Sequence, residues 1–172
     1  MSLSVFVTAG GSAIMTLMDD GIAVQDTYPE DFAHCYGCGR YNDNGHQIKT
    51  YVTGGTTLTR HIPAPYYTGA GDFAYGGIIA SLIDCHSAGS AAIFWLQQHG
   101  HNVGDIAAPR FVTARLEVDY VAPTPLGMVE LVGRAEEAGE RKVIVATDLL
   151  ADGQITARGR AVLIKVSESA DS

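Results

Sequence analysis

One acidic residue stands alone in a long apolar stretch of the sequence. Between Ala74 and Gln98, Asp84 is the only residue that carries a formal charge at neutral pH. A buried carboxylate without a partner is costly, so such a group either does chemistry, often with a shifted pKa, or is satisfied by hydrogen bonds. Asp84 is therefore a candidate functional residue. The alternative is a structural role, with the carboxylate bonded to a neighbouring loop.

The predicted surroundings of Asp84 favour function. The chain breaks at Gly76-Gly77, and the apolar stretch that follows predicts one long helix over about 77–98. At 100° per residue, Asp84 lies on a side of small residues, which leaves room for another backbone or a slender ligand, roughly 10 Å along the axis from Gly77. That side contains Gly77, Ala80, Ser81, Asp84, Ala88, Ala91 and Ala92, and the bulky side contains Ile78, Ile79, Leu82, Ile83, Ile93, Phe94 and Leu96.

Cysteine and histidine residues indicate a second possible kind of chemistry, which is metal binding. Cys35 and Cys38 have the spacing of a metal-ligand pair, and His34 or His46 could complete a set. A structural zinc site usually needs a second clustered pair, and the sequence has no other pair with this spacing. We therefore expect a tight turn with partly buried thiols and no metal site.

Other cysteine and histidine residues have simpler interpretations. Cys85 and His86 follow Asp84 directly, but neighbours on a helix point about 100° apart, which argues against a Cys–His nucleophilic pair. His86 falls on the bulky side, where we expect a satisfied core contact. His99 and His101 are flanked by Gly and Asn and are expected at a solvated helix end.

Composition narrows the class of protein. The 172 residues are 47% hydrophobic and 17% charged, which is typical of one globular domain. A formal charge of −8 argues against nucleic-acid binding, although an anionic small molecule could bind where basic groups gather. Three cysteines favour a cytoplasmic location. No apolar run is expected to approach the length needed to span a membrane, and none is expected to act as a secretory signal.

The elements around the helix are predicted to be strands. Alternating residues and turn signals divide the chain into one domain over 32–166, an N-terminal arm over 1–31 with a possible helix at 12–18, and a flexible tail over 167–172. In the strand over 111–121, simple alternation places Thr113 on the same face as Arg115 and away from Leu116. The six predicted strands cover residues 47–52, 56–62, 111–121, 128–135, 142–151 and 155–166.

One helix among about six strands, without β-α-β alternation, predicts an α+β fold. We expect a curved antiparallel sheet wrapped around the helix. The same sheet cannot also cover the small side of the helix. A second copy of the chain is the natural cover, so we expect at least a dimer.

Several segments match one known family in order. They are residues 35–39 with Asn42 and Gly45 behind them, Tyr75-Gly76-Gly77 with Leu82 and Asp84, residues 113–123, residues 141–143 and residues 153–157. This ordered set resembles the hotdog-fold acyl-coenzyme A thioesterases, in particular their phenylacetate-pathway-like branch. The resemblance covers roughly residues 32–166 and implies the hotdog fold.

The resemblance implies roles for individual residues. Asp84 would be the helix carboxylate that acts as general base on water or as nucleophile. Gly77 would give its backbone N–H to the thioester oxygen at the positive end of the helix, and Gly76 would permit close approach of the backbone. A polar residue from the second subunit completes the site in related members, and Thr113 matches the threonine found there.

One position departs from the family pattern. The histidine of the family signature is Tyr75 in this chain. A neutral phenol can donate a hydrogen bond, but its pKa of about 10 makes it a poor base at neutral pH. If the family histidine only positions groups, activity should survive the replacement.

Basic and aromatic residues are candidates for substrate recognition. Coenzyme A is strongly anionic, so an acidic protein needs cations at the mouth of its channel. Arg141 and Lys142 are the first candidates, followed by Arg110 and Arg115, each with the alternative of a solvated charge at a strand edge. Tyr66, Tyr67, Phe73 and Trp95 could form an acyl pocket or could simply pack.

The leading hypothesis is hydrolysis of an acyl-coenzyme A thioester without a cofactor. The active site would lie at a subunit interface of a dimer or a dimer of dimers. Two alternatives stay open. A hydratase or dehydratase of acyl thioesters usually needs a histidine, and Tyr75 counts against it. A non-catalytic acyl-coenzyme A binder would not need Asp84.

Overall fold

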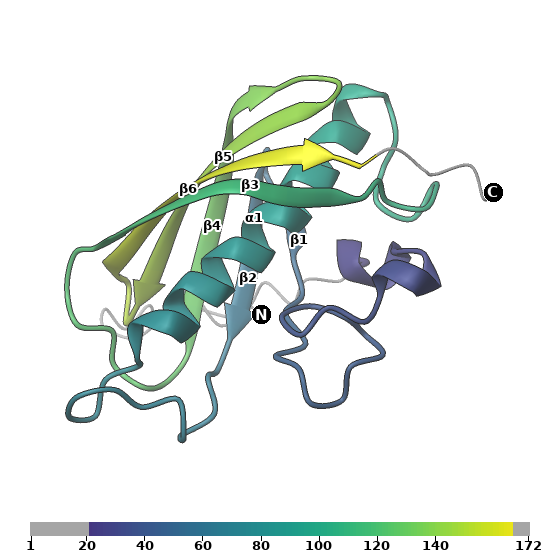
Figure 1. The fold of residues 1–172 in the computed structure, drawn as a ribbon. Helices are drawn as coiled ribbons and strands as arrows, with labels where there is room; N and C mark the ends of the chain where they lie inside the picture. The colour runs from purple at the N-terminus through teal and green to yellow at the C-terminus, as the bar shows by residue number, and fades with distance from the viewer. Residues whose placement is uncertain (1–20, 167–172) are drawn as a thin grey trace, which may run out of the picture.

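The computed structural model describes residues 21–166, so the predicted helix at 12–18 and the tail over 167–172 lie outside the described residues. One long helix crosses a curved, fully antiparallel sheet of six strands, in the order β1-β2-β4-β5-β6-β3 (Figure 1). The predicted α+β architecture is confirmed. The elements are η1 (Val24–Thr27), η2 (Glu30–Phe32), β1 (Tyr51–Thr53), β2 (Thr56–His61), α1 (Gly76–Gln98), β3 (Phe111–Tyr120), β4 (Val129–Ala138), β5 (Lys142–Ala151) and β6 (Gln154–Lys165).

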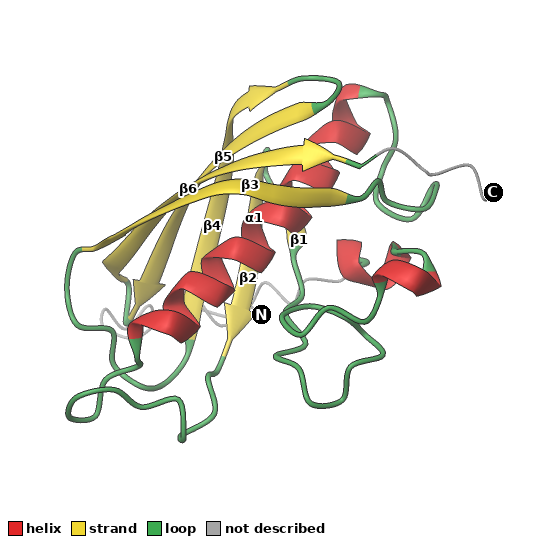
Figure 2. Ribbon diagram, viewed as in Figure 1, coloured by secondary structure: helices red, strands yellow, loops and turns green. Residues whose placement is uncertain are grey.

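The first strand is shorter than predicted. Residues 47–50 lie outside β1, and Gln47 has a left-handed backbone with φ of 53°. The Gln47 side chain donates to the carbonyl oxygens of Gly39 and Asn42, and the Ile48 N–H donates to the carbonyl of Gly37. Gln47 and Ile48 therefore bond to the cysteine-containing turn that precedes β1 and do not join the sheet. Helices and loops that precede β1 lie beside α1 (Figure 2).

The core lies between α1 and the sheet. The bulky side of α1 is buried as predicted, and apolar residues from β4, β5 and β6 pack against it. Burial of large aliphatic side chains is worth about 1.5–3 kcal/mol each, which makes this interface the main source of stability. Fully buried residues of α1 on this side include Ile78, Leu82, Ile83, Ile93 and Leu96.

Polar side chains on the sheet side of α1 are also buried, and they bond to one another. His86 and Ser90 contact Thr57 and Thr59 of β2, and Ser87 bonds to Thr147 of β5. A side chain at Gly133 would lie 2.7 Å from the His86 ring, so this glycine makes room for the cluster. His86 is the satisfied core residue that the sequence predicted.

The small side of α1 is only partly covered. Gly77 is exposed, Ala80, Ser81, Asp84 and Ala88 are half-exposed, and Ala91 and Ala92 are buried. The prediction of an open face is therefore correct only for the first half of the helix. The expectation that no apolar run approaches membrane-spanning length is wrong, because α1 is long and apolar enough. However, 72% of its most apolar window is buried in the protein, as in a core helix.

A β-bulge in β3 changes which residues face the helix. Thr113 pairs with Leu163 of β6, and Arg115 pairs with the next partner residue, so Ala114 is an extra residue in the ladder. The bulge shifts the alternation by one position. Thr113 consequently faces α1 together with Leu116, which corrects the prediction that they lie on opposite faces.

Candidate active site on helix α1

Among residues 21–166, Asp84 has one side-chain hydrogen-bond partner, Thr113. The Thr113 hydroxyl donates a hydrogen bond of 2.6 Å to Oδ1 of Asp84. Both side chains are half-buried. The bulge at Ala114 makes this contact possible, because it turns Thr113 toward the helix. The resemblance implied that Thr113 completes the site from a second subunit; within one chain, its hydroxyl also bonds to Asp84 of that same chain.

The N-terminus of α1 carries unpaired donors on the same side of the helix as Asp84. Tyr75 is the N-cap residue, and its side chain does not cap the helix. In the described part of the chain, the backbone N–H of Gly77 donates to no group. First-turn N–H groups and the positive end of the helix dipole attract a developing negative charge. Gly77 can therefore serve as an oxyanion donor.

The Tyr75 ring lies directly against the first turn. A Cβ at Gly77 would come within 2.3 Å of the Tyr75 ring, so glycine is required for this packing. The same ring stacks on Tyr67, with 6.2 Å between centroids, and is 43% exposed. Tyr75 stands where the family has a histidine, and its ring packs beside Gly77 at the helix N-terminus.

Gly76 is held from the other side by the last residue of β3. The Tyr120 hydroxyl donates to the Gly76 carbonyl at 2.8 Å, and a Cβ at Gly76 would lie 3.2 Å from the Tyr120 ring. The glycine thus allows a close approach between the helix start and β3, as expected. Tyr120 was not among the sequence candidates, because its role depends on where β3 ends in space.

The predicted aromatic pocket is divided between two ends of α1. Tyr66 and Tyr67 pack together near the N-terminus, with ring centroids 4.7 Å apart. Trp95 lies near the C-terminus, where it stacks on His99 at 3.7 Å. A separation of 20 residues between Tyr75 and Trp95 is roughly 30 Å along a helix. Trp95 therefore cannot line one pocket with the tyrosines of its own chain.

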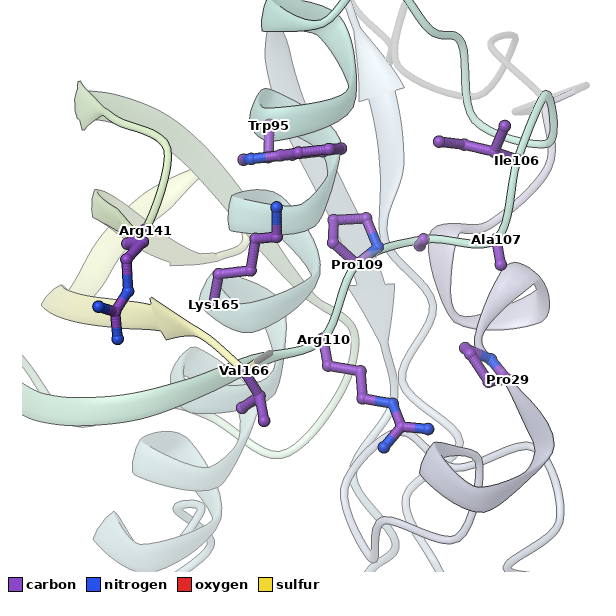
Figure 3. A pocket seen from close by; sticks show the side chains of 10 residues that line it. Pro29, Trp95, Ile106, Ala107, Pro109, Arg110, Arg141, Lys165 and Val166 are labelled. Atoms are coloured by element: carbon purple, nitrogen blue, oxygen red, sulfur yellow. The ribbon is translucent and has the colours of Figure 1, made fainter. Parts of the chain in front are cut away.

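Trp95 instead lines a cavity of about 500 Å³ at the C-terminal end of α1 (Figure 3). Trp95 follows Asp84 by 11 residues, which places both on one side of the helix, roughly 16 Å apart along the axis. The cavity and the carboxylate are therefore separate places. Its lining residues are Pro29, Trp95, Ile106, Ala107, Ala108, Pro109, Arg110, Arg141, Lys165 and Val166.

Three cations, Arg110, Arg141 and Lys165, are among the residues that line this cavity. Arg110 is paired with Asp31, and Lys165 is paired with Glu140 and lies 3.9 Å from the centre of the Trp95 ring. Within residues 21–166, no acidic side chain forms an ion pair with Arg141. Arg141 was among the first candidates from the sequence, and Arg110 was among the second. Lys165 was missed, since a lysine near a strand end has no distinctive sequence signal.

The other two predicted cations lie elsewhere. Lys142 is the neighbour of Arg141, but its amine pairs with Glu137 at 3.0 Å and it does not line the cavity. Arg115 is exposed on β3 and pairs with Glu117 at 2.6 Å. Lys142 and Arg115 therefore form surface ion pairs, in line with the alternative interpretation of each as a solvated charge.

One group in the described part of the chain is compact enough to hold a metal ion. It consists of Cys35, Cys38 and Cys85, and none of the predicted histidine ligands belongs to it. Cys85 is next to Asp84 in sequence but lies on another side of the helix. The three thiols are free of disulfides.

Comparison with known proteins identifies the family. A sequence profile of the thioesterase superfamily matches residues 71–158, a range that contains Gly77, Asp84 and Thr113. The chain belongs to the thioesterase superfamily. A structure of a thioesterase superfamily protein from Shewanella loihica is 40% identical, with a TM-score of 0.62, and the match covers 81% of this chain and 100% of that one.

Two further relatives of this superfamily member are informative. Acyl-coenzyme A thioesterase THEM4 of Xenopus laevis is 31% identical over 107 residues, which are 60% of this chain and 42% of that protein. The chain thus spans less than half the length of this curated relative. The E. coli PaaI protein from the phenylacetic acid degradation operon shares the fold, with 12% identity, a TM-score of 0.57 and coverage of 71% and 81% of the two chains. The hotdog fold is confirmed.

Proposed function

We propose that this superfamily member is an acyl-coenzyme A thioesterase that uses Asp84 and the N-terminus of α1. The observation that carries the proposal is a half-exposed carboxylate, oriented by Thr113, on the same side of α1 as the free N–H of Gly77. Membership of the thioesterase superfamily supports thioester hydrolysis. The name of the Xenopus relative supports coenzyme A as the carrier.

The chemistry needs only these groups and water. Asp84 takes a proton from water, and the water oxygen attacks the thioester carbon while the carbonyl oxygen accepts the Gly77 N–H. Collapse of the tetrahedral intermediate breaks the C–S bond. The proton held by Asp84 passes to the leaving thiolate, so the products are the acid and free coenzyme A. In the variant mechanism Asp84 attacks directly, and water then hydrolyses the resulting anhydride.

The cavity beside Trp95 is the proposed site for the phosphate groups. Arg141 has no acidic partner in the described residues, and Arg110 and Lys165 add positive charge next to it. Arginine binds phosphate through parallel hydrogen bonds. A long substrate could lie along one side of α1, with its anionic end at the cavity and its thioester toward Asp84.

A second copy of the chain is the proposed cover for Asp84. β3 is an edge strand, bonded only to β6 among the described strands, and Val112 on it is 46% exposed. Edge-to-edge pairing of β3 with its copy would hide this apolar surface and extend the sheet. Asp84 and Gly77 are roughly 10 Å apart along one helix. In a two-fold dimer, each site could combine Asp84 of one chain with Gly77 of the other.

The test is a thiol-release assay with short, long and aromatic acyl-coenzyme A substrates, together with acyl-pantetheine that lacks the nucleotide. We expect turnover of at least one acyl-coenzyme A, a higher KM for the pantetheine analogue, and loss of turnover in Asp84→Ala. Tight binding of acyl-coenzyme A without turnover would favour the non-catalytic binder. Hydration of an unsaturated thioester without thiol release would favour the hydratase.

A further inference from the structure

Three thiols from two distant segments meet beside the candidate active site. Cys35 and Cys38 lie in the turn that precedes β1, and Cys85 lies in the middle of α1. All three sulfur atoms are within 4.8 Å of one another, and the Cys35 and Cys85 sulfurs are 3.9 Å apart. Cys38 and Cys85 are buried, whereas Cys35 is exposed.

The turn is shaped to let the helix thiol enter it. A Cβ at Gly37 would lie 2.1 Å from the Cys85 sulfur, so any larger residue would push that thiol away. A Cβ at Gly39 would lie 2.4 Å from the backbone nitrogen of Cys35, and the Gly39 N–H closes the turn on the Cys35 carbonyl at 2.8 Å. Both glycines are therefore needed to bring the three sulfurs together.

We propose that Cys35, Cys38 and Cys85 bind one thiophilic metal ion of the zinc type. Zinc–sulfur bonds of about 2.3 Å at tetrahedral angles require sulfurs roughly 3.8 Å apart, close to the 3.9 Å between Cys35 and Cys85. Three thiolates fill three positions, and the exposed side at Cys35 leaves the fourth to water. Soft thiolate ligands select zinc over magnesium or calcium.

A disulfide would explain the cluster less well. It would join two sulfurs at about 2.05 Å and leave the third thiol without a role. It would also need an oxidant. A metal ion uses all three sulfurs and links the turn to α1 next to Asp84, so it would stabilise the fold as well as the site.

The test is a zinc titration of chain that has been stripped with a chelator and fully reduced, in competition with a chromogenic chelator. We expect one zinc ion per chain with a Kd below micromolar, and a melting temperature that rises with added zinc. Cadmium should give thiolate-to-metal absorption. Cys35→Ser, at the exposed position, should lower the affinity at least a hundredfold, and Cys85→Ser should do the same.

A matched control is His34→Gln, which changes an exposed potential ligand next to Cys35 and should leave binding unchanged. Circular dichroism of each variant separates loss of binding from loss of folding. The proposal is wrong if the reduced chain binds no zinc tighter than micromolar, or if Cys35→Ser and Cys85→Ser bind zinc as the parent does. Neither outcome depends on thioesterase activity.

Discussion

Asp84 and His86 are two positions apart on α1, yet their surroundings are opposite. His86 is fully buried against the sheet, where Nδ1 bonds to Thr59 at 2.9 Å and Nε2 lies 3.4 Å from both Thr57 and Ser90. Asp84 is half-exposed and, in the part of the chain that the structure describes, has Thr113 as its single side-chain partner. Both ring nitrogens of His86 therefore have hydrogen-bond partners, whereas the Asp84 carboxylate can still accept hydrogen bonds from a ligand.

The difference separates a structural polar residue from a functional one. Both ring nitrogens of His86 have partners, and burial lowers its pKa to about 3, so the ring is neutral and has no proton to exchange near pH 7. A carboxylate with an exposed oxygen can accept a proton from water without breaking the fold. The two faces of α1 thus divide stability from chemistry, and each prediction below tests that division.

The largest expected effect is that of Asp84→Asn on turnover. The amide keeps the shape and can still accept from Thr113, but it cannot take a proton. General-base catalysis is worth about 10²–10⁴-fold, so we expect kcat to fall at least a hundredfold, with KM changed less than about threefold. Urea unfolding should show little change in stability. Undiminished activity would remove Asp84 from the mechanism.

His86 should affect stability and its pH dependence instead. The folded pKa of about 3 lies below the unfolded value of about 6.5, so between these values only the unfolded state gains a proton. Stability from this group is complete above about pH 6.5 and is lost as the pH falls toward 3. The loss at pH 5, relative to the stability at about pH 8, is about 2 kcal/mol, or roughly thirtyfold in the unfolding equilibrium.

The measurement is urea unfolding of the wild type and His86→Gln across this range of pH. The variant should lack this part of the pH dependence, even if it is less stable at every pH. Its kcat at neutral pH should stay within about twofold of the wild type. Parallel stability curves for the two proteins would contradict the assignment of His86 to the structural face.

Thr113→Val tests how the open face is organised. The substitution removes the hydroxyl that bonds to Asp84 but keeps the branched shape. A hydrogen bond to a charged group is worth about 1.5–3 kcal/mol, so we expect kcat to fall about tenfold while KM stays similar. Thr113→Ser should restore most of the rate because it returns the donor. Equal losses in both variants would point to packing, not orientation.

The two faces were accessible from the sequence because helical periodicity is a local rule. A step of 100° per residue was enough to separate Asp84 from His86 and to predict the bulky core side. The contact with Thr113 was not accessible in this way. It depends on the extra residue Ala114, and a bulge is defined by pairing with β6, which is distant in sequence.

Sites assembled from distant segments were the main omissions. The cavity combines Arg110 before β3, Arg141 between β4 and β5, and Lys165 at the end of β6. Only the closed sheet brings them together. Cys85 was likewise missed as a partner of Cys35, because the turn and the helix are 50 residues apart. The sequence could identify the residue types but not their convergence.

Arg141→Ala tests the cavity at the C-terminal end of α1 as the site for the phosphate groups of the substrate. Because Arg141 lacks an acidic partner in the described residues, its loss should raise KM for acyl-coenzyme A about five- to tenfold, with kcat nearly unchanged. Lys142→Ala is the matched control, since this neighbour pairs with Glu137 outside the cavity and should change KM less than twofold. Equal effects of both variants would indicate a general charge effect. Acyl-pantetheine should not respond to either substitution.

The smallest expected effect is that of Tyr75→Phe. The Tyr75 ring packs against Gly77 and stacks on Tyr67, whereas its hydroxyl has no partner among the described residues. If the ring alone shapes the entrance to the helix N-terminus, kcat should change less than about threefold and the pH profile should keep its form. A large loss of kcat would show that the phenol donates to the reacting thioester. The companion Tyr75→His should also be close to the wild type, because Asp84 supplies the base, and a large gain in rate would mean that the phenol limits the natural site.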